Sequence, residues 1–329
     1  MSYITNFPDG VSSWGIPMVG GGNSSFTGFG NTYFVDATYG NDLHDGTSLE
    51  SAFATIQAAV TAQIANTKGQ GDTIFVLPGT YTESITGNLT SCRLIGYHPF
   101  SVRVTPTASH AYSGNLHDAL ITGIMFDSPT TTNLDYAAVR FTTVQDSVIT
   151  NCMFGKQGGA TENSVGVMFG TYATGTSTVS FHRSVFSNNQ ILNNGGGNCF
   201  YYGLVMGSGS GDATNANSRT MWNSRIENNI INGSEQGIRL ISNSGGSFGT
   251  IIKDNVIAGS PLDNGETLGT GIYFLDDTAA QYARIWVIKN YVFAQDDAIE
   301  GFAPAMTMGN IVSVGNAGSE TPASETGQQ

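Results

Sequence analysis

Charged side chains are scarce in this sequence: Lys, Arg, Asp and Glu make up 11% of its residues, against about 25% in an ordinary globular protein. Basic residues are the scarcer sign, because 12 Lys and Arg face 25 Asp and Glu and leave a formal charge of −13. No nucleic-acid partner is therefore expected, since phosphate binding requires a basic surface. The 40% hydrophobic content also excludes a disordered chain, which combines low hydrophobicity with high charge.

Cysteines and long hydrophobic runs are lacking as well. Cys92, Cys152 and Cys199 lie far apart without C-x-x-C spacing, so we expect neither a disulfide framework nor a metal site. No run of 18 apolar residues occurs, which predicts no membrane insertion. The first 20 residues contain no Lys or Arg and are interrupted by Pro8 and Pro17, so they do not read as a secretory signal peptide. We expect a protein made in the cytoplasm, without a cofactor.

Glycine and asparagine are abundant instead, and one asparagine motif recurs along the chain. The motif has an apolar residue three positions before the asparagine. The asparagines are Asn151, Asn189, Asn229, Asn255, Asn290 and Asn310, with Gly123 opening the series, and the preceding apolar residues are Leu120, Val148, Phe186, Ile226, Ile252 and Val287. Turn preference alone is the alternative explanation. The shared register favours a ladder of stacked, hydrogen-bonded amides, because a buried Asn needs partners.

A second series interleaves with the first and keeps the same order. Its alternating residues should point inward and stack; they are Val139/Phe141, Val167/Phe169, Leu204/Met206, Ile238/Leu240 and Ile272/Phe274. The residue between each pair points outward, which gives the stripe Arg140, Met168, Val205, Arg239, Tyr273 and Glu300. Two independent repeats of this kind predict an all-β protein in which each winding of the chain pairs in parallel with the next.

Three regions are expected along the chain. Residues 1–31 form an irregular arm, residues 32–315 form the coil, and residues 316–329 form a polar tail without large apolar residues. Within the coil region, apolar residues at helical spacing predict one helix over about 51–65; they are Phe53, Ile56, Val60 and Ile64. This helix should cover the open end of the first winding.

The arm carries large apolar side chains, namely Phe7, Trp14, Ile16 and Met18. Exposed apolar groups of this kind mark contact surfaces. We expect the arm to dock on another protein; an arm that lies on its own domain is the alternative.

The stretch from Tyr33 to Asp42, the segment Asp45-Gly-Thr, the segment from Ala52 to Ala59, and the strand-like Asp72 to Glu83 resemble the start of the right-handed parallel β-helix, pectin-lyase-like superfamily. The resemblance implies a single-stranded β-helix with an N-terminal capping helix. The segment from Phe7 to Met18 looks like the N-terminus of bacteriophage virion proteins. The superfamily includes lyases, hydrolases, esterases, phage tailspikes and inert structural rods, so it implies fold more than function.

Two acidic pairs are the candidate catalytic residues: Asp276-Asp277 and Asp296-Asp297. The run Asp-Asp-Ala-Ile beginning at Asp296 is similar to the acid pair of polygalacturonases, but the last histidine is His182, so the histidine that those enzymes need downstream is missing. Asp276 and Asp296 do not share a phase in the repeat. Aspartates that cap turns are the alternative explanation.

The outward stripe mixes Arg, Met and Tyr, which protein–protein interfaces favour. Arg140, Arg239, Tyr273 and Glu300 are therefore candidate residues of a subunit interface, and phage β-helices by analogy suggest a homotrimer. The leading hypothesis is a phage virion structural protein, a capsid decoration, cement or spike-like β-helix located in the virion and bound to a capsid or tail protein. The alternatives are a tailspike-type polysaccharide depolymerase, acting as glycoside hydrolase or lyase, and a module that binds a cell-surface glycan.

Overall fold

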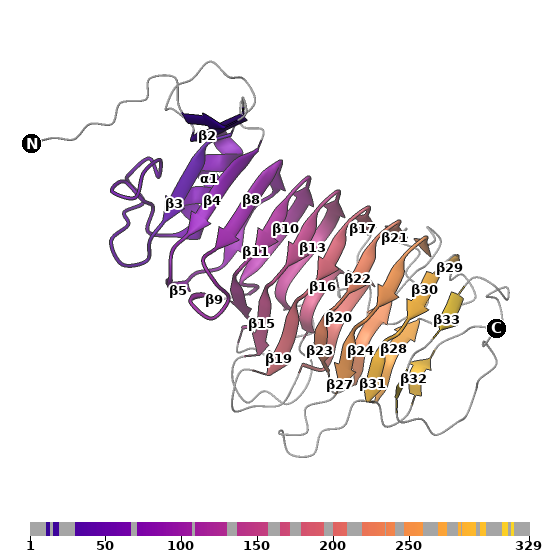
Figure 1. Cartoon of the computed structure of the whole chain (residues 1–329). Helices are drawn as coiled ribbons and strands as arrows, with labels where there is room; N and C mark the ends of the chain where they lie inside the picture. Colours follow the sequence, from indigo (N-terminus) through magenta and orange to yellow (C-terminus); the bar gives the residue numbers. More distant parts are fainter. Residues whose placement is uncertain are drawn as a thin grey trace, which may run out of the picture.

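The computed structural model describes residues 11–13, 16–19, 30–66, 71–106, 109–129, 137–156, 165–171, 179–193, 200–208, 219–233, 235–240, 247–258, 269–274, 282–283, 285–293, 297–300, 311–314 and 317–318. The described chain winds into a rod of short strands stacked from the N-terminal to the C-terminal end (Figure 1). Three parallel sheets run along this rod. The protein is a right-handed parallel β-helix, as the sequence predicts.

From β4 to β32, each winding contributes strands to all three sheets. Sheet 1 contains β3 (Thr32–Val35), β4 (Asp72–Val76), β8 (Cys92–Gly96), β11 (Leu120–Thr122), β14 (Val148–Thr150), β18 (Val185–Ser187), β22 (Arg225–Glu227), β26 (Ile251–Lys253), β30 (Ile285–Ile288) and β33 (Ile311–Val314). Sheet 2 contains β5 (Gly79–Thr82), β9 (Val102–Thr105), β12 (Met125–Asp127), β15 (Met153–Lys156), β19 (Gln190–Asn193), β23 (Ile230–Asn232), β27 (Val256–Ala258), β31 (Tyr291–Phe293) and β34 (Ala317–Gly318). Sheet 3 contains β6 (Ile85–Thr86), β7 (Leu89–Thr90), β10 (Tyr112–His117), β13 (Ala137–Gln145), β16 (Val165–Thr171), β17 (Val179–His182), β20 (Tyr202–Ser208), β21 (Arg219–Trp222), β24 (Gln236–Leu240), β25 (Ser247–Phe248), β28 (Thr270–Phe274), β29 (Tyr282–Ala283) and β32 (Asp297–Glu300).

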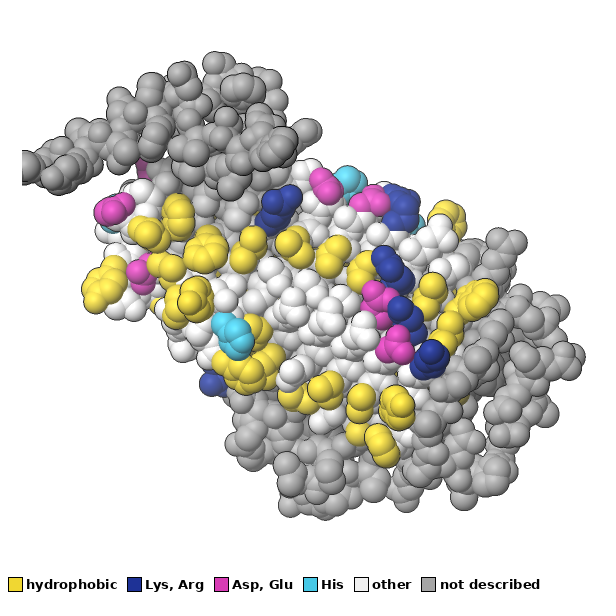
Figure 2. Space-filling model, viewed as in Figure 1, with side chains coloured by type: hydrophobic (Ala, Val, Ile, Leu, Met, Phe, Trp, Pro, Cys, Tyr) yellow, Lys and Arg dark blue, Asp and Glu magenta, His cyan; other side chains and the backbone are white. Residues whose placement is uncertain are grey.

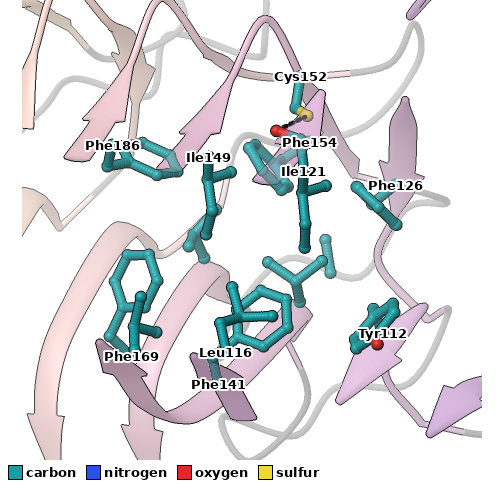
Figure 3. Packing of buried hydrophobic residues seen from close by; sticks show 14 of the residues in the cluster. Tyr112, Leu116, Ile121, Phe126, Phe141, Ile149, Cys152, Phe154, Phe169 and Phe186 are labelled. Carbon is teal, nitrogen blue, oxygen red and sulfur yellow. Dashed lines mark hydrogen bonds between the residues drawn. The ribbon is translucent and has the colours of Figure 1, made fainter. Parts of the chain in front are cut away.

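The inward side chains of the second series stack as predicted. Val139 pairs with Val167 and Phe141 with Phe169, and the same register continues to Ile272. All ten predicted inward residues are at most 1% exposed. Aromatic rings stack in the same way elsewhere in the core, where the ring centroids of Phe126, Phe154 and Phe186 follow one another at 5.9 Å (Figure 3). Period-two alternation thus fixes which residues form the core.

Two corners of most windings are tight turns built on one left-handed residue. Between sheets 1 and 2 this residue has φ from 51° to 74° and is Gly123, Asn151, Asn188, Asn228, Asp254 or Lys289. Between sheets 3 and 1 it has φ from 46° to 67° and is Ser91, Asp118, Asp146, Arg183, Asn223 or Gly249. Gly, Asn and Asp dominate both sets because they adopt this conformation most readily.

The asparagine ladder lies directly after the turn between sheets 1 and 2. Oδ1 of Asn229 accepts from the N–H of Asn189 at 3.0 Å, and Oδ1 of Asn255 accepts from the N–H of Asn229 at 3.0 Å. Oδ1 of Asn290 accepts from the N–H of Asn255 at 3.1 Å. Each Nδ2 group donates to a main-chain carbonyl of the neighbouring winding. The ladder predicted from Asn189 to Asn290 is confirmed, and Asn310 lies outside the described residues.

Asn151 was wrongly assigned to this ladder. It is the left-handed turn residue, and Cys152 holds the ladder position, donating its N–H to Oδ1 of Asn189 at 2.9 Å. The inward apolar residues on β11 and β14 are consequently Ile121 and Ile149. Leu120 and Val148 lie one residue earlier and point outward. The error arose because Asn is favoured at both adjacent turn positions.

A second polar ladder, which the sequence reasoning missed, lies at the corner between sheets 3 and 1. Ser147, Ser184 and Ser224 are each 1% exposed and follow the left-handed residue of their turn. Oγ of Ser184 accepts from the N–H of Ser147 at 3.1 Å, and Oγ of Ser224 accepts from the N–H of Ser184 at 3.2 Å. Both corners are therefore cross-linked from winding to winding by buried side chains.

The helix is shorter than predicted. α1 spans Ile56–Ala65, with Thr55 as its N-cap residue. The backbone amides of Ala54 and Thr55 donate to Asp42, and those of Ile56 and Gln57 donate to the carboxylate of Glu83. These contacts fix the start of the helix, because the first amides of a helix lack partners within it. Phe53 is buried ahead of the helix in a bridge to Val35, and Ile64 is exposed. The helix packs against strands β3, β4, β6 and β7 of the first windings.

The ends of the chain are described only in part. Strands β1 (Val11–Ser13) and β2 (Ile16–Val19) form an antiparallel pair in a sheet of their own. Phe7 and Trp14 lie outside the described residues. Ala317 and Gly318 pair with β31, so the described ladder extends just beyond the predicted boundary at residue 315. No helix among the described residues has the length and apolar character needed to cross a membrane.

Candidate ligand site on the outer face of sheet 3

The predicted outward stripe exists as one column on sheet 3. Arg140, Met168, Val205, Arg239, Tyr273 and Glu300 pair in this order from β13 to β32. Its centre is covered within the single chain, because Met168 and Val205 are fully buried and Arg239 is 8% exposed. These three side chains therefore offer little free surface to another subunit. The interface role of Arg140, Arg239, Tyr273 and Glu300 stays a prediction.

The covered part of this face has an apolar cluster of its own, separate from the core between the sheets. Its buried members are Ala137, Val165, Met168, Tyr202 and Val205, and Tyr201 and Tyr273 pack against it while remaining partly exposed. The rings of Tyr201 and Tyr202 meet edge to face with centroids 4.7 Å apart. Sheet 3 thus carries a second apolar layer on its outer side.

Arg239 is the charged group at the edge of this layer. Its Nη1 donates to Oε1 of Gln236 at 2.7 Å and lies 3.5 Å from the hydroxyl of Tyr202. Its guanidinium carbon lies 5.0 Å from the ring centroid of Tyr202 and 5.0 Å from that of Tyr273. Strands β20 and β28 flank β24 on its two sides. The cation is therefore held between rings contributed by the preceding and the following winding.

Arg239 has no anionic partner among the residues that the structure describes. No carboxylate in the described part of the chain lies within 4.0 Å of its guanidinium, and its buried Nε has no hydrogen-bond partner. The other tight arginine contacts differ in this respect: Arg103 pairs with Asp127 at 2.6 Å and Arg183 pairs with Asp146 at 2.6 Å. An arginine stays protonated in proteins, so Arg239 places an unpaired positive charge in a largely dehydrated position.

The predicted catalytic acids are not brought together by the described residues. Asp276, Asp277 and Asp296 lie outside them. Asp297 begins β32, where its backbone pairs with Thr270. Across the described ranges, no group of three or more His, Cys, Asp or Glu is arranged to hold a metal ion. The catalytic role of these four aspartates stays a prediction.

Gln236 and Tyr202 belong to the site but were not predicted from the sequence. Strict alternation from the inward residue Ile238 assigns Gln236 to the core, yet its side chain meets Arg239 on the outer face. The signal was the glycine that follows each of these residues: Gly203 and Gly237 interrupt the pairing of β20 with β24. A glycine inside a strand commonly marks such an irregularity.

A second polar feature lies at the corner between sheets 3 and 1. Arg183 donates to both carboxylate oxygens of Asp146 at 2.6 Å, and this hydrogen-bonded cation lowers the pKa of Asp146. Beside them the ring of His182 stacks on Trp222 with centroids 5.2 Å apart. Burial is the main cause that lowers the pKa of His182. The charges of Asp146 and Arg183 are satisfied by each other, unlike the charge of Arg239.

The outer face of sheet 1 shows a row of hydrophobic side chains along the rod and a cluster of charged side chains towards its C-terminal end (Figure 2). The register places Leu120, Val148 and Val185 in one column with Ile251 and Trp286. The charged cluster contains Arg225, Glu227, Lys253 and Asp254, in which Lys253 lies 3.3 Å from Glu227. Opposite charges are already paired on this face.

Comparison with known proteins supports the β-helix and little else. No family model and no curated protein matches this chain. Among solved structures, pectin methylesterase from carrot is similar at a TM-score of 0.51 and 13% identity, over 91% of this chain and 86% of that one. Rice weevil pectin methylesterase is similar at a TM-score of 0.52 and 11% identity, over 86% of this chain and 89% of that one. At such identities the similarity shows the fold alone.

Proposed function

We propose that this chain is a structural protein of a bacteriophage particle, a rod-like decoration, cement or spike protein that binds a capsid or tail protein through residues 1–31. The observation that carries this proposal is the separate β1–β2 sheet, which shares no strand pairing with the three sheets of the rod. An arm that forms its own sheet is available to contact a partner. The resemblance of the segment from Phe7 to Met18 to virion proteins points the same way.

The rod itself supports a structural role. Its corners are cross-linked by the serine and asparagine ladders, which join successive windings through buried side chains. Glycoside hydrolysis needs two carboxyl groups about 5–9.5 Å apart. The alternative of a polysaccharide depolymerase rests on Asp276, Asp277, Asp296 and Asp297, and it stays a prediction. Association as a homotrimer is part of the proposal, and sedimentation equilibrium of the purified chain measures it.

The arm is tested in particles assembled with a full-length variant in which Phe7, Trp14, Ile16 and Met18 are all replaced by Ser. We expect the variant to remain folded, because β1 and β2 form a sheet separate from those of the rod, and to be lost from purified particles. Quantitative mass spectrometry of the particles measures its copy number, and circular dichroism of the free protein controls for folding. Incorporation at the wild-type copy number would refute the anchoring role.

The depolymerase alternative is tested with polysaccharides of the host surface. We expect the wild-type chain to release no reducing sugar from them. Turnover that Asp297→Asn abolishes would replace the structural proposal with the enzymatic one. The variant Asp254→Asn is the matched control, since Asp254 lies in a turn between sheets 1 and 2, away from sheet 3.

A further inference from the structure

The outer face of sheet 2 carries large exposed apolar side chains in the C-terminal half of the rod, where β19, β23, β27 and β31 follow one another (Figure 1). Ile230, Val256, Tyr291 and Phe293 are between 38% and 58% exposed. Ile230 pairs with Val256 and Val256 with Tyr291 in successive windings, and Phe293 ends the strand that Tyr291 begins. These four residues are the sheet 2 patch. Apolar side chains gathered in this way mark a contact surface.

The patch lies on strands that contain no charged residue. The four strands β19, β23, β27 and β31 contain only Gln, Asn, Ala, Ile, Leu, Val, Tyr and Phe. The neighbouring sheets differ in the same part of the rod, because sheet 1 carries Arg225, Glu227 and Lys253, and sheet 3 carries Arg239 and Glu300. The patch is therefore an uncharged strip in a chain whose formal charge is −13.

This distribution of charge indicates where two copies of the chain meet at the lowest cost. Copies that each carry a formal charge of −13 repel one another. The repulsion is smallest where the surfaces that meet carry no charge themselves, because like charges placed opposite each other in a contact are strongly unfavourable. The centre of a protein interface is also depleted of charged residues and enriched in aromatic ones such as Tyr and Phe. The sheet 2 patch meets both conditions.

The spacing of the patch favours an identical rod as its partner. Parallel strands of successive windings lie about 4.8 Å apart, so Ile230, Val256 and Tyr291 follow one another along the rod at that interval. A second copy aligned in parallel presents the same interval, and the side chains of two such faces interdigitate, as they do where two sheets pack about 10 Å apart. Exposed polar residues border the patch at the corner with sheet 1, namely Asn228, Asp254 and Lys289. A polar rim around an apolar centre is typical of an interface.

We propose that copies of this chain associate side by side through the sheet 2 patch, with their rod axes parallel and with Ile230, Val256 and Tyr291 at the centre of the contact. This inference rests on the homotrimer that forms part of the proposed function, and it names the face that the subunits share. The stripe on sheet 3, which includes Arg239 and Tyr273, is the competing location. Attachment of residues 1–31 to a particle does not enter into the inference.

Sedimentation equilibrium of the purified full-length chain measures the association. We expect the wild type to associate, and to do so more tightly as sodium chloride rises from about 50 to about 500 mM, because salt screens the repulsion between acidic copies and leaves an apolar contact intact. A contact made by oppositely charged side chains would weaken over the same range. The salt dependence thus distinguishes the sheet 2 patch from a charged interface.

Variants assign the association to one face. Tyr291→Lys is expected to raise the dissociation constant at least about tenfold, because the contact would bury an unpaired ammonium group in each copy. This substitution lowers the net negative charge, so general repulsion does not explain a loss. Trp286→Lys is the matched control, since Trp286 is also exposed and lies on β30, which precedes β31 in the chain but belongs to sheet 1. Tyr273→Ser tests the stripe on sheet 3, and both of these variants should associate like the wild type.

Folding is checked by circular dichroism in the same samples. Tyr291 is exposed, so Tyr291→Lys should retain the wild-type spectrum. Its unfolding temperature should lose the dependence on protein concentration that association gives the wild type. If this variant does not fold, Val256→Gln tests the same patch through a smaller change.

The proposal is overturned by a wild-type chain that stays monomeric at about 100 μM, by association that persists unchanged in Tyr291→Lys, or by an equal loss in Tyr291→Lys and Trp286→Lys. The first result also removes the homotrimer from the proposed function, whereas the other two leave it in place with another interface. A loss in Tyr273→Ser alone would locate the contact on sheet 3 and would equally overturn the proposal. A dimer that Tyr291→Lys dissociates would confirm the patch and correct the number of subunits. The anchoring arm is tested separately, by the copy number of the protein in particles.

Discussion

Oδ1 of Asn290 accepts two hydrogen bonds from Asn255, one from the backbone N–H at 3.1 Å and one from Nδ2 at 2.9 Å. Asn255 receives the same two contacts from Asn229, at 3.0 and 2.9 Å. Each amide thus replaces the main-chain partner that the turn of the neighbouring winding lacks. The ladder is a continuous series of buried, hydrogen-bonded amides, and removing one member leaves its neighbours without partners.

Asn255→Ala is expected to lower the free energy of unfolding by about 2–4 kcal/mol, because the buried N–H of Asn229 loses its acceptor. Urea denaturation followed by circular dichroism measures the change. Asn188→Gly is the matched control: Asn188 is exposed and has φ of 55°, which glycine adopts freely. A loss in Asn255→Ala no greater than in this control would show that the ladder does not stabilise the rod.

Cys152→Asn is expected to extend the ladder by one winding. Sγ of Cys152 lies 3.8 Å from the carbonyl oxygen of Ile121, the place that Nδ2 groups occupy in the later windings. We expect stability within about 1 kcal/mol of the wild type, whereas Cys152→Leu, which is larger and has no donor, should lose about 1–3 kcal/mol. Thermal unfolding compares the two. If the Asn variant is no more stable than the Leu variant, Cys152 does not hold a ladder position.

Stability should fall as the pH drops from about 7 to about 4 because of His110. Burial lowers the pKa of His110 to about 4, and Nδ1 lies 3.0 Å from both the N–H and the carbonyl oxygen of Ala137. The folded pKa is below the unfolded one, so in this window the unfolded chain binds a proton that the native chain does not. The loss is about 3 kcal/mol.

The urea midpoint of wild type and His110→Gln, measured across this pH range, isolates the contribution of His110. The variant is expected to start less stable, because it perturbs the contact to Ala137, and to show the shallower pH dependence. Parallel pH profiles for the two proteins would rule out this titration as a source of acid sensitivity.

Cys92 and Cys152 should be unreactive in the native protein. Burial raises the pKa of each thiol to about 12, so almost no thiolate is present at neutral or mildly alkaline pH. We expect iodoacetamide to label both only after unfolding, which peptide mass spectrometry detects residue by residue. Labelling of either thiol in the folded chain would show that its position in the core opens.

The residues that the sequence predicts best are those with a strict period. Val139, Phe141 and their equivalents alternate inward and outward, and a shift of one residue would turn every side chain to the wrong face, so their register follows from hydrophobicity alone. Asn151 failed for the opposite reason: two adjacent turn positions both favour Asn, and only the hydrogen bonds distinguish them. The serine ladder was missed because serine is common in turns of every kind.

The candidate site was only half predictable. Alternation correctly placed Arg239 and Tyr273 on the outer face, but it could not show that Arg239 is buried. It also could not show that Gln236 leaves the inward register to reach Arg239, because Gly237 makes that strand irregular. Burial of an outward residue depends on what packs over the sheet, which no local pattern records.

The winding repeats the same tight turns at two corners, and the lengths of other connections vary. Each tight turn around sheet 1 has the same form in successive windings, whereas the segments that join sheet 2 to sheet 3 differ: β19 ends at Asn193 and β20 begins at Tyr202, but β23 ends at Asn232 and β24 begins at Gln236. Length varies within sheet 3 as well, since β20 ends at Ser208 and β21 begins at Arg219, so the insertions lie away from the two corners that hold the ladders. Peptides grafted into these variable segments would follow one another along the rod and would leave the hydrogen bonds of both ladders in place.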